Sequence, residues 1–200
     1  AVERLLADHL AATFDVVLPH VQAAQVEEAA ALADAHAIDA VIGLGGGSCV
    51  GMAKAVSMAL ERRHAGGTLR SPRPGGPVVG VTQPVPGAAP RKVTVDDPRV
   101  APRLVIYDPL LTLGLPPGLT AATGINALAH AVEALYSLTR NPLATAAAEA
   151  AIRAIGSALP TCWEQGDDLQ ARTTLLVGAH LAGAALATVK MGVHHGACHA

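Results

Sequence analysis

The spacing of apolar and polar positions predicts a chain that alternates strands with helices in its first half. Apolar runs of about five residues predict four short strands, at residues 14–18, 40–44, 77–82 and 103–108. The segments between them have the spacing of amphipathic helices, at residues 19–37 and 48–64. Strands that alternate with helices favour a parallel α/β sheet covered by helices on both faces.

The pattern changes after residue 109. Alanine-rich amphipathic segments predict three helices, at residues 120–138, 142–159 and 167–189. The dipeptide Asn141-Pro142 predicts an N-cap followed by proline at the first helical position. We therefore expect an α/β domain at 1–113 and a helical domain at 114–200. The proline-rich residues 83–102 are expected to be a loop, with a possible short edge strand at 91–95.

The stretch with the most specific chemistry is Gly45-Gly-Gly-Ser48, directly after the expected strand at 40–44. Three glycines favour a tight turn, and Ser48 is the expected N-cap of the next helix. Such a turn forms an anion site, because free N–H groups and the positive end of the helix dipole point to one place. Lys54 can add charge there or anchor the helix. Ser48 stands where the dinucleotide fingerprint requires its last glycine, so a turn without a ligand is the alternative.

Histidines in the second half form another candidate site. Asn126 and His130 are four residues apart on one expected helix, and His195 and His199 have the same spacing. Histidines in this arrangement can bind a metal, bind an anionic substrate or transfer protons near neutral pH. For each histidine taken singly, a hydrogen-bonded core position is the competing interpretation.

Composition narrows the expected partners. The net charge is −2, from 14 basic and 16 acidic residues, and aromatic residues make up 2%, so nucleic acid and membrane surfaces are not expected. Three cysteines without a C-x-x-C pair favour a reducing, cytoplasmic compartment. The longest apolar run, residues 175–189, is too short for a membrane span and contains His180. Because the chain begins without methionine inside an expected helix and stops just after a histidine cluster, we expect a fragment.

Four motifs together resemble the iron-containing (group III) alcohol dehydrogenase superfamily and, within it, the maleylacetate reductase branch. The motifs are Gly45-Gly-Gly-Ser48 with Lys54, the run from Tyr107 to Pro116, the run from Gly124 to Tyr136, and His194-His-x-x-Cys-His199. The resemblance begins at about residue 14. It implies a Rossmann-like, dehydroquinate synthase-like sheet domain, then a helical substrate domain, in a chain truncated at both ends.

This resemblance implies an NAD(P)H-dependent oxidoreductase that reduces the C=C bond of maleylacetate to 3-oxoadipate in the degradation of aromatic and chloroaromatic compounds. NADH or NADPH would contact Gly45, Gly46, Gly47, Ser48, Lys54 and Thr82. The substrate would be a small dicarboxylate, and four side chains would line its binding site: Asn126, His130, His195 and His199. We expect His199 to relay a proton and Asn126 to donate a hydrogen bond. A homodimer is the expected assembly.

Departures from the superfamily's pattern bear on metal binding. The resemblance implies an aspartate where this chain has Asn126, used with the histidines matching His130 and His195 to hold Fe or Zn. A neutral amide is a poorer ligand than a carboxylate, and Gly51 also stands where aspartate is frequent, so no metal is expected. If one binds, His130 and His195 are its candidate ligands. After Thr82 the residues 83–90 replace a stretch that contacts the cofactor in relatives.

Two other interpretations remain open at this point. One is a metal-dependent alcohol dehydrogenase of the same superfamily, which Asn126 disfavours. The other is an inactive, truncated paralogue.

Overall fold

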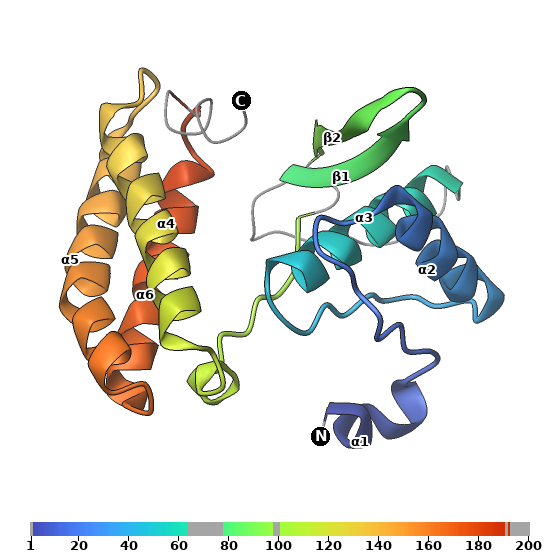
Figure 1. Cartoon of the computed structure of the whole chain (residues 1–200), viewed down its shortest axis with the longest axis horizontal. Coiled ribbons are helices and arrows are strands. Elements are labelled where there is room, and N and C mark those ends of the chain that lie inside the picture. Colours follow the sequence, from blue (N-terminus) through green and yellow to red (C-terminus); the bar gives the residue numbers. More distant parts are fainter. Residues whose placement is uncertain (1, 64–77, 98–100, 191, 193–200) are drawn as a thin grey trace. The chain divides into compact units, whose positions relative to one another are not determined.

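A computed structural model describes residues 2–63, 78–97, 101–190 and 192 of the 200-residue chain. Its contacts divide the chain into two compact units, Ala1–Leu104 and Val105–Ala200 (Figure 1). The domain boundary expected at 113/114 falls inside the second unit. The reason is local: the short 3₁₀ helix η3 (Pro109–Thr112) packs against α6 (Leu169–Leu186) and so belongs with the helices that follow it.

The first unit contains helices α1 (Val2–Leu6), η1 (Ala7–His9), α2 (Ala23–Ala35) and α3 (Gly47–Arg63). The helices expected at 19–37 and 48–64 are confirmed as α2 and α3. α2 begins later than expected because His20 and Val21 have positive φ angles of 65° and 35°, which no helical residue adopts. The N-cap of α2 is therefore Gln22.

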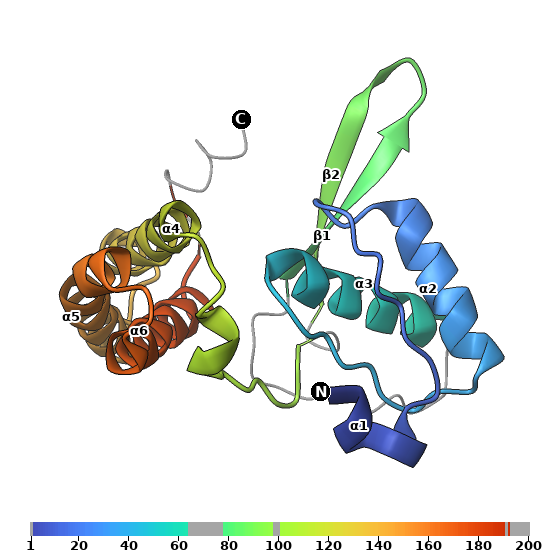
Figure 2. The ribbon, with the colours of Figure 1, turned by 60° about the horizontal axis from the view of Figure 1, so that its bottom comes forward.

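A β-hairpin follows in the same unit, seen most clearly in Figure 2. Strands β1 (Val78–Val85) and β2 (Ala88–Asp96) pair antiparallel, with Val81 opposite Val93. The ladder is irregular between Gln83 and Val85, where Pro84 has no N–H to donate. The prediction of a loop from residue 83 is therefore wrong as far as Asp96, whereas the short strand proposed at 91–95 is confirmed inside β2.

Of the four predicted strands, the one at 77–82 is found as β1. Residues 14–18, 40–44 and 103–108 are not in strands in the described structure, so those three predictions are wrong for this chain. A strand exists only through a hydrogen-bonded neighbour. Residues 16 and 18 instead bond to one side chain: Gln25 accepts from the N–H of Leu18 across 3.0 Å and donates to the carbonyl of Val16 across 2.7 Å. The Rossmann-like parallel sheet remains a prediction.

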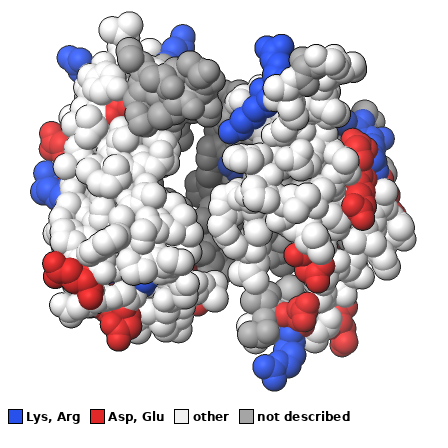
Figure 3. Space-filling model, in the orientation of Figure 1, with Lys and Arg blue, Asp and Glu red and all other residues white. Residues whose placement is uncertain are grey.

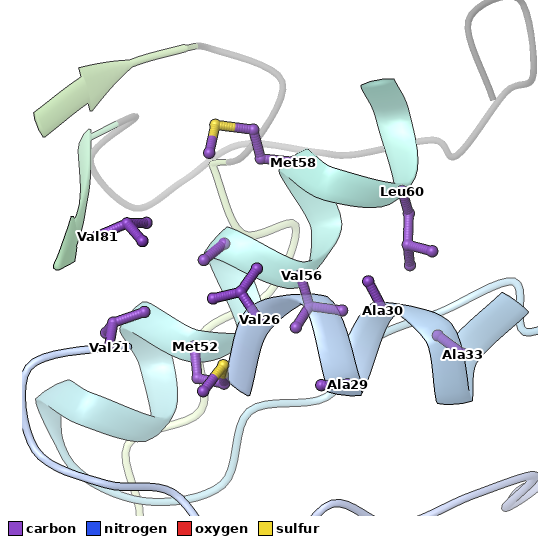
Figure 4. Packing of buried hydrophobic residues seen from close by; sticks show 11 residues of the cluster. Val21, Val26, Ala29, Ala30, Ala33, Met52, Val56, Met58, Leu60 and Val81 are labelled. Carbon is purple, nitrogen blue, oxygen red and sulfur yellow. The ribbon is translucent and has the colours of Figure 1, made fainter. Parts of the chain in front are cut away.

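The core of the first unit lies where α2, α3 and β1 meet (Figure 4). Apolar side chains of α2 pack against those of α3, and Val81 of β1 closes the cluster; the helical members include Val26, Ala30, Met52, Val56 and Leu60. At the end of α3, Arg63 donates to Asp34 across 2.6 Å and to Glu27 across 2.5 Å, both on α2. Apolar packing and these two ion pairs hold the two helices together.

The second unit is built from α4 (Pro117–Tyr136), α5 (Pro142–Glu164) and α6, which all pack on one another. The three predicted helices are confirmed. Their shared core consists mostly of fully buried alanines: Ala131, Ala134, Ala148, Ala151, Ala182 and Ala185, with Ile155. Small side chains let the helix axes approach closely, and a β-carbon added to Gly178 on α6 would stand 2.7 Å from Cγ1 of Ile155 on α5.

Helix ends in this unit follow the sequence signals closely. Asn141 caps α5 by accepting from the N–H of Ala144 across 2.9 Å, as predicted, and Asp168 caps α6 in the same way. α5 continues past its predicted end at residue 159. Pro160 removes one backbone hydrogen bond, but Cys162 on the following turn is fully buried, so packing maintains the helix to Glu164.

Candidate functional site

The glycine turn leads directly into α3. Gly45 has a φ of +137°, a conformation that requires glycine. Helix α3 begins at Gly47, and the carbonyl of Gly46 accepts from the N–H of Val50 across 3.1 Å. Ser48 therefore lies inside the first turn of the helix, and the prediction that it is the N-cap is wrong. The preceding glycines allow the helix to begin two residues earlier than an N-cap at Ser48 would imply.

The glycines have two different roles in this turn. A β-carbon on Gly43 would stand 2.8 Å from Cβ of Ala53, and one on Gly45 would stand 2.8 Å from Sγ of Cys49. Those two glycines allow the chain to pack against α3. By contrast, a β-carbon on Gly46 or Gly47 would meet nothing within 4 Å. The open space lies beside the N-terminus of α3, whose first N–H groups have no partner within the helix, and such a place suits a phosphate group.

Lys54 and Thr82 complete the predicted cofactor residues. Lys54 is half-buried on α3, and this burial lowers the pKa of its ammonium group below the ordinary value. Thr82 on β1 donates its N–H to the carbonyl of Val21 across 2.9 Å. Val21 in turn contacts Gly51 on α3. The structure thus links Thr82, through Val21, to the N-terminal half of the helix that follows the glycine turn.

Asn126 and His130 lie on α4, as predicted. Asn126 is exposed and His130 is half-buried, and their four-residue separation places them on the same side of the helix. His195 and His199 lie outside the described residues, so their positions remain predictions. The described chain reaches Gly192, whose N–H donates to Oε1 of Glu133 on α4 across 2.8 Å.

A group of polar contacts next to this position was not predicted from the sequence. Ser137 donates to the carbonyl of Lys190 across 2.9 Å, and Thr139 accepts from the N–H of Lys190 across 2.7 Å. Asn141 donates to the carbonyl of Thr188 across 3.4 Å. The available signal was the polar composition of residues 137–141 between two apolar helices.

A second feature was also missed. A cavity of about 120 Å³ lies between η3, α4 and α6, and its lining includes Thr112, Leu115, Thr120, Arg172 and Leu176. Oγ1 of Thr120 is buried and has no hydrogen-bond partner in the described structure. Arg172 is almost fully buried and donates its Nε–H to the carbonyl of Gly166. Most of the remaining lining residues are apolar, so the cavity resembles a packing defect more than a polar binding site.

The described residues supply few ligands for a metal ion. In the described part of the chain, no three His, Cys, Asp or Glu residues are grouped to hold an ion. Helix α4 offers one imidazole, His130, and the neutral amide of Asn126. Two neutral donors hold Fe or Zn less well than a set that includes a carboxylate, and the other candidate ligand, His195, lies outside the described residues.

The surface gives two further observations. On the face drawn in Figure 3, basic and acidic atoms of the described residues are interspersed and form no patch of one sign. None of the helices in the described ranges has the length and hydropathy required to cross a bilayer.

Comparison with known proteins identifies the family. The profile described as "Iron-containing alcohol dehydrogenase" matches residues 1–86, and the one described as "Fe-containing alcohol dehydrogenase family, C-terminal" matches residues 120–200. The chain belongs to the iron-containing alcohol dehydrogenase family. The first match includes the glycine turn and the second includes Asn126, His130 and the histidine cluster.

Curated relatives within this family are maleylacetate reductases. One, from Pseudomonas sp. (strain P51), is 37% identical and matches 99% of this chain; maleylacetate reductase 2 of Cupriavidus pinatubonensis is 40% identical and matches 98%. The crystal structure of the maleylacetate reductase from Rhizobium sp. strain MTP-10005 superposes with a TM-score of 0.88 at 34% identity over 99% of this chain. The chain spans 55% of the length of each of these relatives.

Proposed function

We propose that this chain acts in a maleylacetate reductase, which reduces the C=C bond of maleylacetate with NADH or NADPH to form 3-oxoadipate. The observation that carries the proposal is the similarity to curated maleylacetate reductases, at 37% and 40% identity over nearly the whole chain. The exposed amide of Asn126 on α4 supports the same branch of the family, because it replaces the expected carboxylate ligand of a metal.

The cofactor would bind through the glycine turn. Its pyrophosphate would lie on the N–H groups at the start of α3, beside Gly46 and Gly47, where no side chain blocks the approach. Gly45, Ser48, Lys54 and Thr82 complete the proposed contacts. When bound, NADH or NADPH supplies the hydride. The half-buried Lys54 ammonium adds positive charge on the same helix.

The helical unit would bind the substrate. Hydride addition to a C=C bond conjugated with a ketone builds negative charge on the ketone oxygen, which hydrogen-bond donors must stabilise. We assign this task to His130 together with His195, and the donation of a further hydrogen bond to Asn126. His199 would supply the proton that completes the reduction. The two carboxylates of the substrate give these donors additional acceptors.

A metal-dependent alcohol dehydrogenase is the second candidate, favoured by the iron in the family's description. We propose instead that the chain works without a metal, because Asn126 is a weak ligand for a divalent cation. The substitution Asn126→Asp separates the two candidates. It should increase the affinity for Zn²⁺ or Fe²⁺, measured by titration with metal analysis, and should lower chelator-resistant turnover of maleylacetate.

The first experiment follows oxidation of NADH and NADPH in the presence of maleylacetate, before and after chelation. Simple alcohols with NAD⁺ provide the comparison. Turnover of maleylacetate that survives chelation supports the proposal. Alcohol oxidation that chelation abolishes contradicts it and supports the metal-dependent candidate. No turnover together with no NADH binding supports an inactive protein, and sedimentation of the same sample tests the proposed homodimer.

A separate readout tests the cofactor site independently of turnover. Cys49 lies in the first turn of α3 and is partly exposed, and its Sγ lies against Gly45 of the glycine turn. NADH should therefore slow alkylation of Cys49, followed by peptide mass spectrometry. Gly47→Val fills the open space and should abolish this protection. Exposed Gly183→Val on α6 is the matched control and should leave protection unchanged.

A further inference from the structure

Glu133 is an unusual residue for its position. It lies on α4 between the core alanines Ala131 and Ala134 and is fully buried. A carboxyl group in such a place requires hydrogen-bond donors, because burying it without them is strongly unfavourable. One donor is the backbone N–H of Gly192, 2.8 Å from Oε1.

Gly192 fits closely against this carboxyl group. A β-carbon added to it would stand 3.1 Å from Oε1 of Glu133 and 3.6 Å from Cε2 of Tyr136. A β-carbon there would require the Glu133 carboxyl group to shift by a few tenths of an ångström, which disturbs the contact. The absence of a side chain at position 192 therefore allows the hydrogen bond to Glu133.

Three more side chains fix the residues just before Gly192. The hydroxyl of Ser137 donates to the carbonyl of Lys190, so Thr139 supplies the proton in the 3.1 Å contact between the two hydroxyls. Thr139 in turn accepts from the N–H of Lys190. With the contact from Asn141 to Thr188, the end of α4 and the α4–α5 turn hold residues 188–190 independently of Glu133.

We propose that Glu133 is a positioning residue, which holds Gly192, the residue just before the histidine segment, against the helix that carries Asn126 and His130. The proposal rests on the function proposed above. Glu133 is three residues after His130, a spacing that places their β-carbons roughly 5–6 Å apart on a helix. His195 is three positions after Gly192, and three positions span at most about 11 Å in any conformation. Loss of the anchor would therefore release from α4 the residue that stands three positions before His195.

Loss of the Glu133 carboxyl group should affect turnover more than folding. Displacement of a reacting group by about 1 Å can lower a rate about 100-fold. Glu133→Ala removes the acceptor for Gly192, while the contacts at Ser137, Thr139 and Asn141 remain. Glu133→Gln retains an oxygen acceptor and nearly the same volume, so it should rescue the function of the anchor.

The experiment compares two variants of Glu133, Glu133→Ala and Glu133→Gln. The control is Glu149→Ala, which removes a carboxylate from the exposed surface of α5. Each variant is assayed with maleylacetate and NADH, and exchange of the Gly192 amide is followed by NMR. For Glu133→Ala we expect kcat to fall roughly 100-fold with KM nearly unchanged, and the Gly192 amide to exchange at least about tenfold faster. Glu133→Gln should remain within about threefold of the unmodified protein in both measurements.

The two readouts separate failure of this proposal from failure of the proposed function. If the unmodified protein does not reduce maleylacetate, the function fails, while amide exchange still tests the anchor. Unchanged exchange or unchanged kcat in Glu133→Ala, or a Glu133→Gln variant as impaired as Glu133→Ala, overturns the positioning role. If Glu133→Ala does not fold, Gly192→Ala tests the same contact from its other side, and unchanged kcat there overturns the proposal.

Discussion

Gly51 on α3 contacts Val21 so closely that a β-carbon added to the glycine would stand 2.8 Å from Cγ2 of Val21. In an open helix, Gly→Ala stabilises by about 1 kcal/mol. Here the overlap should reverse the sign, because a well-packed site must shift at a cost of about 1–3 kcal/mol. We expect Gly51→Ala to lower the free energy of unfolding by about 1 kcal/mol, measured by urea denaturation.

The same substitution in a Val21→Ala background provides the control. With the valine methyl groups removed, Gly51→Ala should regain its helix-forming benefit and stabilise by roughly 0.5–1 kcal/mol. Equal changes in the two backgrounds would contradict the contact. With Val21 in place, Gly51→Asp should destabilise more than Gly51→Ala, because it also brings a charged group against the valine.

The buried hydroxyl of Thr120 predicts a stabilising substitution. Its Oγ1 has no partner in the described structure, and an unpaired buried hydroxyl is unfavourable by about 1–3 kcal/mol. Thr120→Val keeps the shape and removes the hydroxyl, so we expect a gain of about 1 kcal/mol in thermal or urea unfolding. Thr174→Val is the control, since its hydroxyl donates to Gln170 and should give no gain. A loss in Thr120→Val would indicate that the cavity holds a bound water.

Asn141 combines two functions, which two substitutions separate. Its Oδ1 caps α5 and its Nδ2 donates to the carbonyl of Thr188. Asn141→Ala should lower the free energy of unfolding by about 1–2 kcal/mol, whereas Asn141→Asp keeps the cap and should cost less than half as much. Asp168→Ala, which removes a cap alone, is the reference at about 1 kcal/mol. Equal losses for Asn141→Ala and Asn141→Asp would show that the contact with Thr188 dominates.

Cys162 predicts a loss of stability in alkaline solution. Burial raises the pKa of its thiol above 9.0, with a further raising effect from Asp168 and a lowering one from Arg172. As the pH rises, the thiol therefore loses its proton in the unfolded chain before it does so in the folded protein. The buried thiol makes its full contribution to the free energy of unfolding below about pH 9, and this contribution is lost as the pH rises through the pKa of Cys162 in the folded state. Urea midpoints should fall as the pH rises above about 9, and less steeply in Cys162→Ala.

Thiol labelling checks the burial of Cys162 directly. In the native protein at pH 8, Cys162 should resist alkylation while the partly exposed Cys49 reacts, as followed on separate peptides. Both should react in denaturant. Rapid native labelling of Cys162 would contradict its burial and the alkaline prediction together.

Helices and their ends could be predicted because the interactions that form them are local. The hydrogen bonds of α4, α5 and α6 join residues four apart, and the cap at Asn141 acts on Ala144, three residues away. The glycine turn could be recognised for a similar reason, since Gly45 needs its backbone conformation whatever surrounds it. Asn126 and His130 share a helix side by spacing alone.

The strands could not be predicted reliably from the sequence, and neither could burial or the contacts of the candidate site. All three depend on partners that are distant in the sequence. The extended segment 40–44 has the composition of a strand but no ladder in the described structure, whereas residues 88–90 form one because β1 lies beside them. Glu133 resembled any polar residue on an amphipathic helix, and only packing placed its carboxyl group against Gly192, 59 residues away. Periodicity encodes interactions within a few residues. Which surfaces are buried together is set by the free energy of packing the whole unit, which no short stretch contains.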